Sequence, residues 1–117
     1  MDIQALKDKS DQASRLLKSL ANDRRFLILC YLSETEKSVG ELERLVDLSQ
    51  SALSQHLARL RRDNLVQTRR DAQTIFYSIA SPEAGAVLQT LHDLYCSDEA
   101  STAQAPAETD RQSASGA

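Results

Sequence analysis

Apolar residues recur at every third or fourth position in the first part of the chain, which is the spacing of one face of an α-helix. Residues 3–20 show this pattern and are expected to form the first helix. Its apolar positions are Ile3, Leu6, Ala13, Leu16, Leu17 and Leu20. Asn22 then offers a side chain that caps helices, with Asp23 in the first turn, so a second helix is predicted to run to about Leu32.

Two further helices are predicted where a serine precedes an apolar run. Ser38 and Glu41 have the spacing of a capping box, which predicts a short third helix to about Val46. After the connection "DLS", Ser49 is predicted to cap a fourth helix that ends near Asp63. Two short helices joined by so tight a turn form a helix-turn-helix, whose second helix enters the major groove of DNA.

The hydrophobic period changes after the fourth helix. The segments "LVQTRR" and "TIFYSIA" are rich in Val, Ile, Thr, Phe and Tyr and are separated by "DAQ", which predicts the two strands of a hairpin. Ser81 and Pro82 are predicted to open a last helix. Its apolar stripe consists of Val87, Leu88, Leu91, Leu94 and Tyr95. From Ser97 onward small and polar residues dominate, which predicts a disordered tail.

The predicted order of four helices, a hairpin and a last helix is a mainly α fold with a small β-hairpin, the winged helix-turn-helix. Residues 1–97 are expected to form one DNA-binding and dimerisation domain, and residues 98–117 an acidic tail. A length of 117 residues suits one domain and is too short for two ordinary ones. Because a helical domain of this size often completes its core by dimerising, a homodimer is expected.

The net charge of −3 conceals a basic segment. Residues 98–117 alone contribute −3, from two Asp and two Glu against one Arg. Residues 44–71 contain six arginines and three aspartates, a local surplus of +3. Such a surplus is a suitable electrostatic footprint for nucleic acid.

The predicted fourth helix has a face suited to reading DNA. Leu53, Leu57 and Leu60 fall at i, i+4 and i+7 and are expected to face the core. The opposite face then carries Ser, Gln, His and Arg. Gln can contact adenine through two hydrogen bonds, Ser can reach a base edge or a phosphate, and Arg neutralises phosphate. The predicted DNA-binding residues are Gln50, Ser51, Ser54, Gln55, His56 and Arg59 on this helix, with Arg69 and Arg70 at the tip of the hairpin, or wing.

Together these segments resemble the ArsR/SmtB family of small dimeric winged-helix repressors. The residues that carry the resemblance are "LANDRRFLILCYL", "SVGEL", "LSQSALSQHLARLRRDNLV" and "IFYSI". The resemblance implies a homodimer formed by the first and last helices, with two recognition helices facing a palindromic operator in double-stranded DNA. Many members have Gly at the wing tip, where this chain has "RRDAQ". Asp71 tolerates a left-handed turn better than most residues and is expected to preserve the wing.

The two cysteines are placed as in the thiol-based persulfide- and sulfide-sensing subgroup of this family, the BigR and HlyU type. Cys30 lies in the second helix and Cys96 ends the last. The resemblance implies that a reactive sulfur species links them by a disulfide or polysulfide and so releases the operator. Arg24 and Arg25 precede Cys30 by one to two turns and would lower the pKa of its thiol if they point toward it. The alternative for Cys30 is packing among its apolar neighbours.

Many members of the family sense metals, but the ligand positions differ here. The Cys-x-Cys pattern at the start of the third helix is replaced by Ser38 and Gly40. The zinc-type site on the last helix needs Asp and His pairs, whereas this helix offers His92 beside Asp93. No metal and no cofactor are therefore predicted. The alternatives within the class are a metal-responsive repressor that uses both cysteines and His92, and a DNA-binding regulator without redox control.

No enzyme is predicted, because the chain has neither a Gly-x-Ser-x-Gly elbow nor a phosphate-binding loop. A protein-interaction module that does not bind DNA is the alternative outside the class. No apolar run approaches the roughly 20 residues that cross a bilayer, and no signal peptide precedes the first charged residues. A cytoplasmic protein without membrane contact is therefore expected, and in that compartment a cysteine pair is rarely a permanent disulfide.

Overall fold

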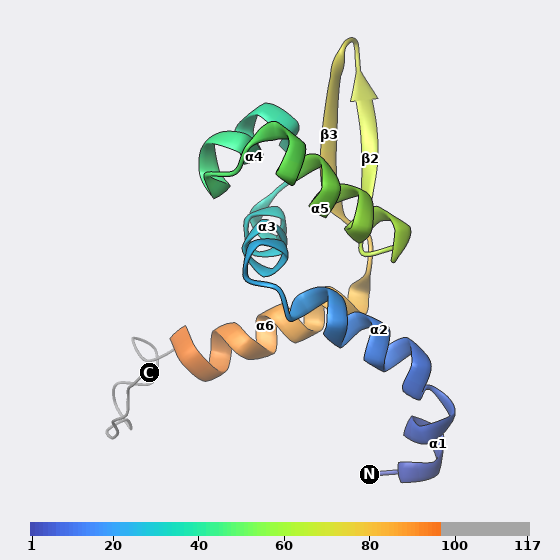
Figure 1. Cartoon of the computed structure of the whole chain (residues 1–117). Helices are drawn as coiled ribbons and strands as arrows, with labels where there is room; N and C mark the ends of the chain where they lie inside the picture. Colours follow the sequence, from blue (N-terminus) through green and yellow to red (C-terminus); the bar gives the residue numbers. More distant parts are fainter. Residues whose placement is uncertain (97–117) are drawn as a thin grey trace. The chain divides into compact units, whose positions relative to one another are not determined.

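The computed structural model describes residues 1–96, whose helices and strands are drawn in Figure 1. Met1–Gly85 form one compact unit, and a second unit begins at Ala86. The elements in chain order are α1 (Ile3–Asp8), α2 (Ser10–Leu20), α3 (Asp23–Glu34), β1 (Lys37–Ser38), α4 (Val39–Val46), α5 (Gln50–Arg62), β2 (Val66–Asp71), β3 (Thr74–Ile79) and α6 (Pro82–Cys96). This confirms the predicted mainly helical fold with a small hairpin. The predicted disordered tail lies outside the described residues.

The single helix predicted for residues 3–20 is wrong at Lys9, where the chain is not helical (φ −107°, ψ 13°) and α1 gives way to α2. The side chain of Asp2 caps α1 by accepting a hydrogen bond from the amide of Ala5 at 3.1 Å. No residue of α1 is buried, so packing does not hold the two helices in line. Ser10 and Asp11 also suit the first turn of a helix better than its interior.

The predicted helix caps from residue 22 to residue 49 are confirmed. Asn22 accepts hydrogen bonds from the amides of Arg24 and Arg25, and α3 continues two residues beyond the predicted end. Ser38 and Glu41 form the capping box of α4, with hydrogen bonds of 3.1 and 2.8 Å.

The turn of the helix-turn-helix follows α4 directly. Asp47 ends α4 in the left-handed region (φ 53°). The hydroxyl of Ser49 then accepts a hydrogen bond from the amide of Ala52 and starts α5. The tight connection between α4 and α5 is therefore fixed by local hydrogen bonds.

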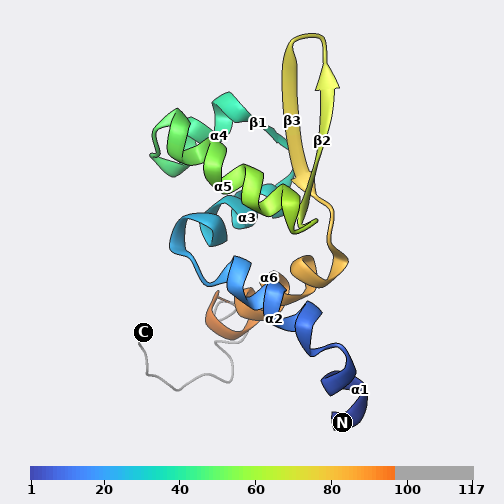
Figure 2. The ribbon, with the colours of Figure 1, turned by 45° about the vertical axis from the view of Figure 1, so that its right-hand side comes forward.

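The sheet has one strand more than predicted. β3 pairs antiparallel with β2 on one side and with β1 on the other, so the strand order is β1-β3-β2. β1 has two residues, Lys37 and Ser38, and it joins the base of the wing to the start of α4. In both Figure 1 and Figure 2 the hairpin of β2 and β3 extends beyond α4 and α5.

The wing turn differs from the expectation. Asp71 is the last residue of β2 and pairs with Thr74. Ala72, not Asp71, adopts the left-handed conformation, with φ of 59°. The register leaves two residues between the strands, and the turns that two-residue hairpin loops favour have positive φ at their first position. Arg70 and Arg69 consequently stand on the strand, two and three residues before Ala72, and not at the turn itself.

The core of the first unit is built from aliphatic side chains of α3, α4 and α5, each at most 3% exposed. They are Ile28, Leu29, Leu32, Leu42, Val46, Leu53, Leu57 and Leu60. The three leucines predicted to face inward from the fourth helix are therefore confirmed. Because burying one such side chain is worth about 1.5–3 kcal/mol, these three positions fix which face of α5 is left outside.

The last helix begins in the first unit, where Ser81 accepts a hydrogen bond from the amide of Ala84 at 3.0 Å. From Ala86 onward α6 belongs to the second unit, in which Leu94 and Tyr95 are 70% and 77% exposed. Among the helices of residues 1–96, none has both the length and the apolar character needed to span a membrane.

Candidate nucleic-acid interface

The outer face of α5 carries the polar residues that the sequence predicted. Gln50, Ser51, Ser54 and Gln55 are all exposed, whereas Leu53, Leu57 and Leu60 of the same helix are buried. Gln offers a donor and an acceptor from one side chain, and Ser offers a hydroxyl that can do either. Side chains of this kind can match the donor and acceptor pattern of base edges in the major groove.

His56 is less accessible than its neighbours on α5. Its side chain is half-buried, and burial is the main cause that lowers its pKa below the ordinary value. The positive charges of Arg25 and Arg24 lower it further. The lowered pKa favours the neutral ring near pH 7, so His56 is predominantly a neutral polar group and not a cation offered to phosphate.

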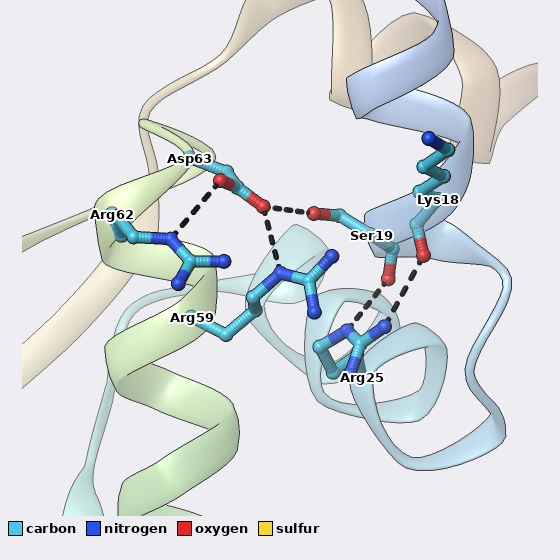
Figure 3. Close-up of polar contacts among 6 residues, drawn as sticks. All are labelled: Lys18, Ser19, Arg25, Arg59, Arg62 and Asp63. Atoms are coloured by element: carbon cyan, nitrogen blue, oxygen red, sulfur yellow. Dashed lines mark hydrogen bonds and ion pairs between the residues drawn. The ribbon is translucent and has the colours of Figure 1, made fainter.

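The guanidinium of Arg59 is held by the chain itself. Its Nε donates to Oδ2 of Asp63 at 3.2 Å, as Figure 3 shows. Asp63 also accepts a hydrogen bond from the hydroxyl of Ser19 and lies 3.6 Å from Nε of Arg62. One edge of the Arg59 guanidinium is thus committed to Asp63, which leaves the remaining donors for other partners.

Arg24 and Arg25 bind carbonyl groups at the ends of other helices. Arg24 donates to the carbonyl of Val46 at the end of α4, at 3.4 Å. Arg25 donates to the carbonyls of Ser19 and Lys18 at the end of α2, at 3.0 and 3.2 Å. Cations placed there satisfy carbonyls that have no partner within the helix. The two arginines donate to these helix ends, and their predicted action on the pKa of the Cys30 thiol stays a prediction.

Arg69 is anchored at the base of the wing. Two of its nitrogens donate to the carboxylate of Glu36, one of them at 3.2 Å, and its guanidinium lies 4.6 Å from the ring centroid of Phe76. The hydrogen bond from Arg69 is the main cause that lowers the pKa of Glu36, so the pair is fully ionised at neutral pH. Arg70, by contrast, is exposed on β2.

A groove of about 420 Å³ lies between α5, the start of α4 and the sheet. It is lined by Val39, Ser54, Leu57, Ala58, Arg61, Arg62 and Tyr77. Arg61, Arg62 and Tyr77 were missed by the sequence reasoning. Arg61 stands seven residues after Ser54 and so on the same helix face, a spacing that could have identified it. The groove continues the polar face of α5 toward the wing with positive charge.

The two cysteines lie in different units. Cys30 is half-buried on α3, and its carbonyl accepts a hydrogen bond from Ser33 at 2.6 Å. Cys96 is exposed at the end of α6. His92 pairs with Asp93 at 3.7 Å, and residues 1–96 contain no group of three His, Cys, Asp or Glu side chains that could hold a metal ion.

Residues 22–68 match the family described as "Bacterial regulatory protein, arsR family". The "Transcriptional activator HlyU" of Vibrio cholerae is 55% identical over 96 residues, which cover 82% of this chain and 89% of that protein. The solved structure of "Reduced HlyU" from Vibrio cholerae is 56% identical with a TM-score of 0.75, covering 80% of this chain and 98% of that one. The structure of the "transcriptional repressor BigR" from Xylella fastidiosa is 34% identical with a TM-score of 0.77, covering 82% and 98%.

The helix-turn-helix, its exposed polar face and the adjoining wing define a DNA-binding winged helix-turn-helix regulator of transcription, not an enzyme. The similarity extends over most of the chain and most of each relative. The chain belongs to the ArsR family of bacterial regulatory proteins, as the residues from Leu16 to Cys96 predicted.

Proposed function

We propose that the protein is a homodimeric repressor that binds a palindromic operator and is released from it by sulfur chemistry at Cys30 and Cys96. The proposed operator binding is supported by the exposed Ser and Gln side chains of α5, which lie beside a basic groove and the wing. Gln50, Ser51, Ser54 and Gln55 are the candidates for base and nearby phosphate contacts.

The basic residues of the interface divide into two groups by their partners. Arg61 and Arg70 have no carboxylate partner within the described residues and are proposed to neutralise phosphate. Arg59 and Arg69 are paired with Asp63 and Glu36, so they are proposed to line the DNA-binding surface without adding a phosphate contact. His56, neutral at pH 7, shapes the surface of α5 and can still donate or accept one hydrogen bond.

Exposed apolar side chains support dimerisation through the first and last helices. Ile3, Leu6 and Leu17 on α1 and α2 are 61%, 50% and 60% exposed. On α6, Leu94 and Tyr95 are also exposed. Covering such side chains against a second copy stabilises a dimer, and a two-fold axis then places two α5 helices about one DNA turn apart.

The sulfur switch requires two thiols and an oxidising sulfur donor, for which inorganic polysulfide is the proposed class. The Cys30 thiolate attacks a sulfur of polysulfide, which forms a persulfide and releases a polysulfide shorter by one sulfur. The Cys96 thiolate then attacks Sγ of the Cys30 persulfide, so that a Cys30–Cys96 disulfide forms and the outer sulfur leaves as hydrosulfide. The similar solved structure from Vibrio cholerae is that of "Reduced HlyU", and this is in keeping with the proposed redox control.

The DNA half is tested by selecting duplexes from a random pool with the wild-type protein and measuring affinity by fluorescence anisotropy. Gln55→Ala should weaken the selected site more than random DNA, whereas Arg70→Ala should weaken both and reduce the salt dependence. The control Gln4→Ala, on α1, should change neither. If the pool yields no enriched sequence, the operator proposal is wrong.

The sulfur half is tested by treating the protein with inorganic polysulfide and mapping linked peptides by mass spectrometry. A Cys30–Cys96 bridge should appear as affinity for the selected duplex falls, and both changes should reverse with dithiothreitol. Cys30→Ser and Cys96→Ser should each keep their DNA affinity after treatment. A Cys30→Ser protein that still loses DNA would refute the switch and leave the DNA half intact.

A further inference from the structure

Asp63 stands directly after the last residue of α5 and connects three helices. Its side chain is 8% exposed. Oδ2 accepts hydrogen bonds from the hydroxyl of Ser19 on α2 and from Nε of Arg59 on α5, and Oδ1 lies 3.6 Å from Nε of Arg62 (Figure 3). The carboxylate thus contacts its own helix and the end of a helix 44 positions earlier in the chain.

Ser19 is itself held on its other side. It is 0% exposed, and its carbonyl accepts a hydrogen bond from Nε of Arg25 at 3.0 Å. The same guanidinium donates to the carbonyl of Lys18 at 3.2 Å. Arg25 lies in the first turn of α3, so α2, α3 and α5 meet in one hydrogen-bonded group. Its members, the Asp63 cluster, are Lys18, Ser19, Arg25, Arg59, Arg62 and Asp63.

The chemistry of this cluster makes it specific for one arrangement of the helices. Burial of Asp63 opposes ionisation, but the hydrogen bonds from Ser19 and Arg59 and the charges of Arg62 and Arg59 outweigh it, so its pKa lies below the ordinary value. A buried carboxylate is stable only with its donors in place. These hydrogen bonds weaken steeply with distance and angle, so they favour one relative position of the groups that they join.

We infer that Asp63 is a positioning residue that sets the orientation of α5 from the position of α2, so that the proposed dimer face and the proposed DNA-reading face act as one body. The inference rests on the proposed function. Leu17, exposed on α2, precedes Ser19 by two residues, and Arg59 follows Gln55 by one helical turn on α5. Loss of the Ser19 bond leaves both faces chemically intact and frees α5 to tilt.

Ser19→Ala tests this with the smallest change, because it deletes one hydroxyl. Ser14→Ala is the matched control, since Ser14 is exposed on the same helix. Affinity is measured for the duplex selected by the wild-type protein and for random duplex, and the dimer constant by analytical ultracentrifugation. Ser19→Ala should lose about tenfold in affinity for the selected duplex and less than twofold for random duplex, with the dimer constant unchanged.

Amide hydrogen exchange, measured without DNA, is a second test of the positioning role, and it does not depend on an operator. The amides of Asp63, Asn64 and Leu65 donate to carbonyls in the last turns of α5. Their exchange should be about tenfold faster in Ser19→Ala than in Ser14→Ala, while the amides of α4 exchange at the same rate in both.

The outcomes separate the inference from the proposed function. Equal exchange in the two variants, or an unchanged ratio of selected to random affinity in Ser19→Ala, overturns the positioning role even if the wild type binds an operator tightly. If no duplex is selected, the operator proposal fails, and the hydrogen-exchange measurement alone then tests the positioning role of Asp63. If Ser19→Ala does not fold, the same measurements are made on Asp63→Asn, because the Asn side chain keeps the shape of Asp and one acceptor oxygen. Wild-type behaviour of that variant also overturns the inference.

Discussion

Glu36 holds a cation that stands at the base of the wing, so neutralising this acid should strengthen DNA binding. The Arg69 side chain is 52% exposed, and Glu36 accepts hydrogen bonds from two of its nitrogens. In Glu36→Gln the formal ion pair is lost, while the stacking of Arg69 on Phe76 is preserved. The guanidinium then becomes available to phosphate, and a negative charge near the DNA is removed.

The size of the effect follows from counterion release. Each additional phosphate contact steepens the dependence of log affinity on log salt by about 0.9. Between about 200 and 50 mM salt, which is roughly 0.6 logarithmic units, one freed Arg69 adds about threefold to the affinity, and two in a dimer about tenfold. Selected and random duplexes should gain alike, because the contact is to phosphate.

The assay is a fluorescence anisotropy titration of a labelled duplex at several salt concentrations. Glu34→Gln is the control, since it removes the same charge two residues away, from a carboxylate that lies 3.5 Å from Lys37. A slope that stays at the wild-type value in Glu36→Gln would refute the reasoning. An equally steeper salt dependence in Glu34→Gln would also refute it, because the effect would then come from the loss of any negative charge and not from the release of Arg69.

Three further predictions concern stability and are read from denaturant unfolding. Ala72→Gly should stabilise the wing by about 0.5–1 kcal/mol, because Gly avoids the cost of φ 59° that Ala bears, whereas Ala72→Val should destabilise it. Leu57→Ala should cost about 2–5 kcal/mol, since Leu57 is 2% exposed, and the 40% exposed Leu45→Ala should cost less. The lowered pKa of His56 means that the folded state favours the neutral ring. The free energy of unfolding should therefore fall as pH drops from about 6.5 toward the lower folded value, and His56→Gln should flatten this dependence.

The helix boundaries from residue 22 to residue 62 were predictable because their signals are local. Asn22, Ser38 and Ser49 each bond to amides two or three positions away, and Glu41 bonds back to Ser38. Such interactions depend on spacing alone, which the sequence displays. The inward face of α5 was predictable for the same reason, since its leucines repeat at helical spacing.

The sequence-based prediction of the fold is wrong where distant residues or weak local preferences determine the structure. β1 has only two residues and exists because Lys37 and Ser38 pair with Tyr77 and Phe76, about 40 positions later. The break at Lys9 follows from the lack of buried contacts along α1, which a periodic pattern does not reveal. At the wing, the two-residue register places the left-handed residue at Ala72, although Asp71 is chemically better suited.

The candidate interface was predicted by residue type, but the sequence does not show which acid pairs with which base. Five arginines stand on the outer face of α5 and the wing: Arg59, Arg61, Arg62, Arg69 and Arg70. Asp63 and Glu36 form ion pairs with three of them within the described residues, namely Arg59, Arg62 and Arg69. Two per protomer remain for phosphate, so a dimer should show a salt slope near −4, against about −9 if all ten contributed. A measured slope close to −9 would mean that DNA displaces both acids on binding.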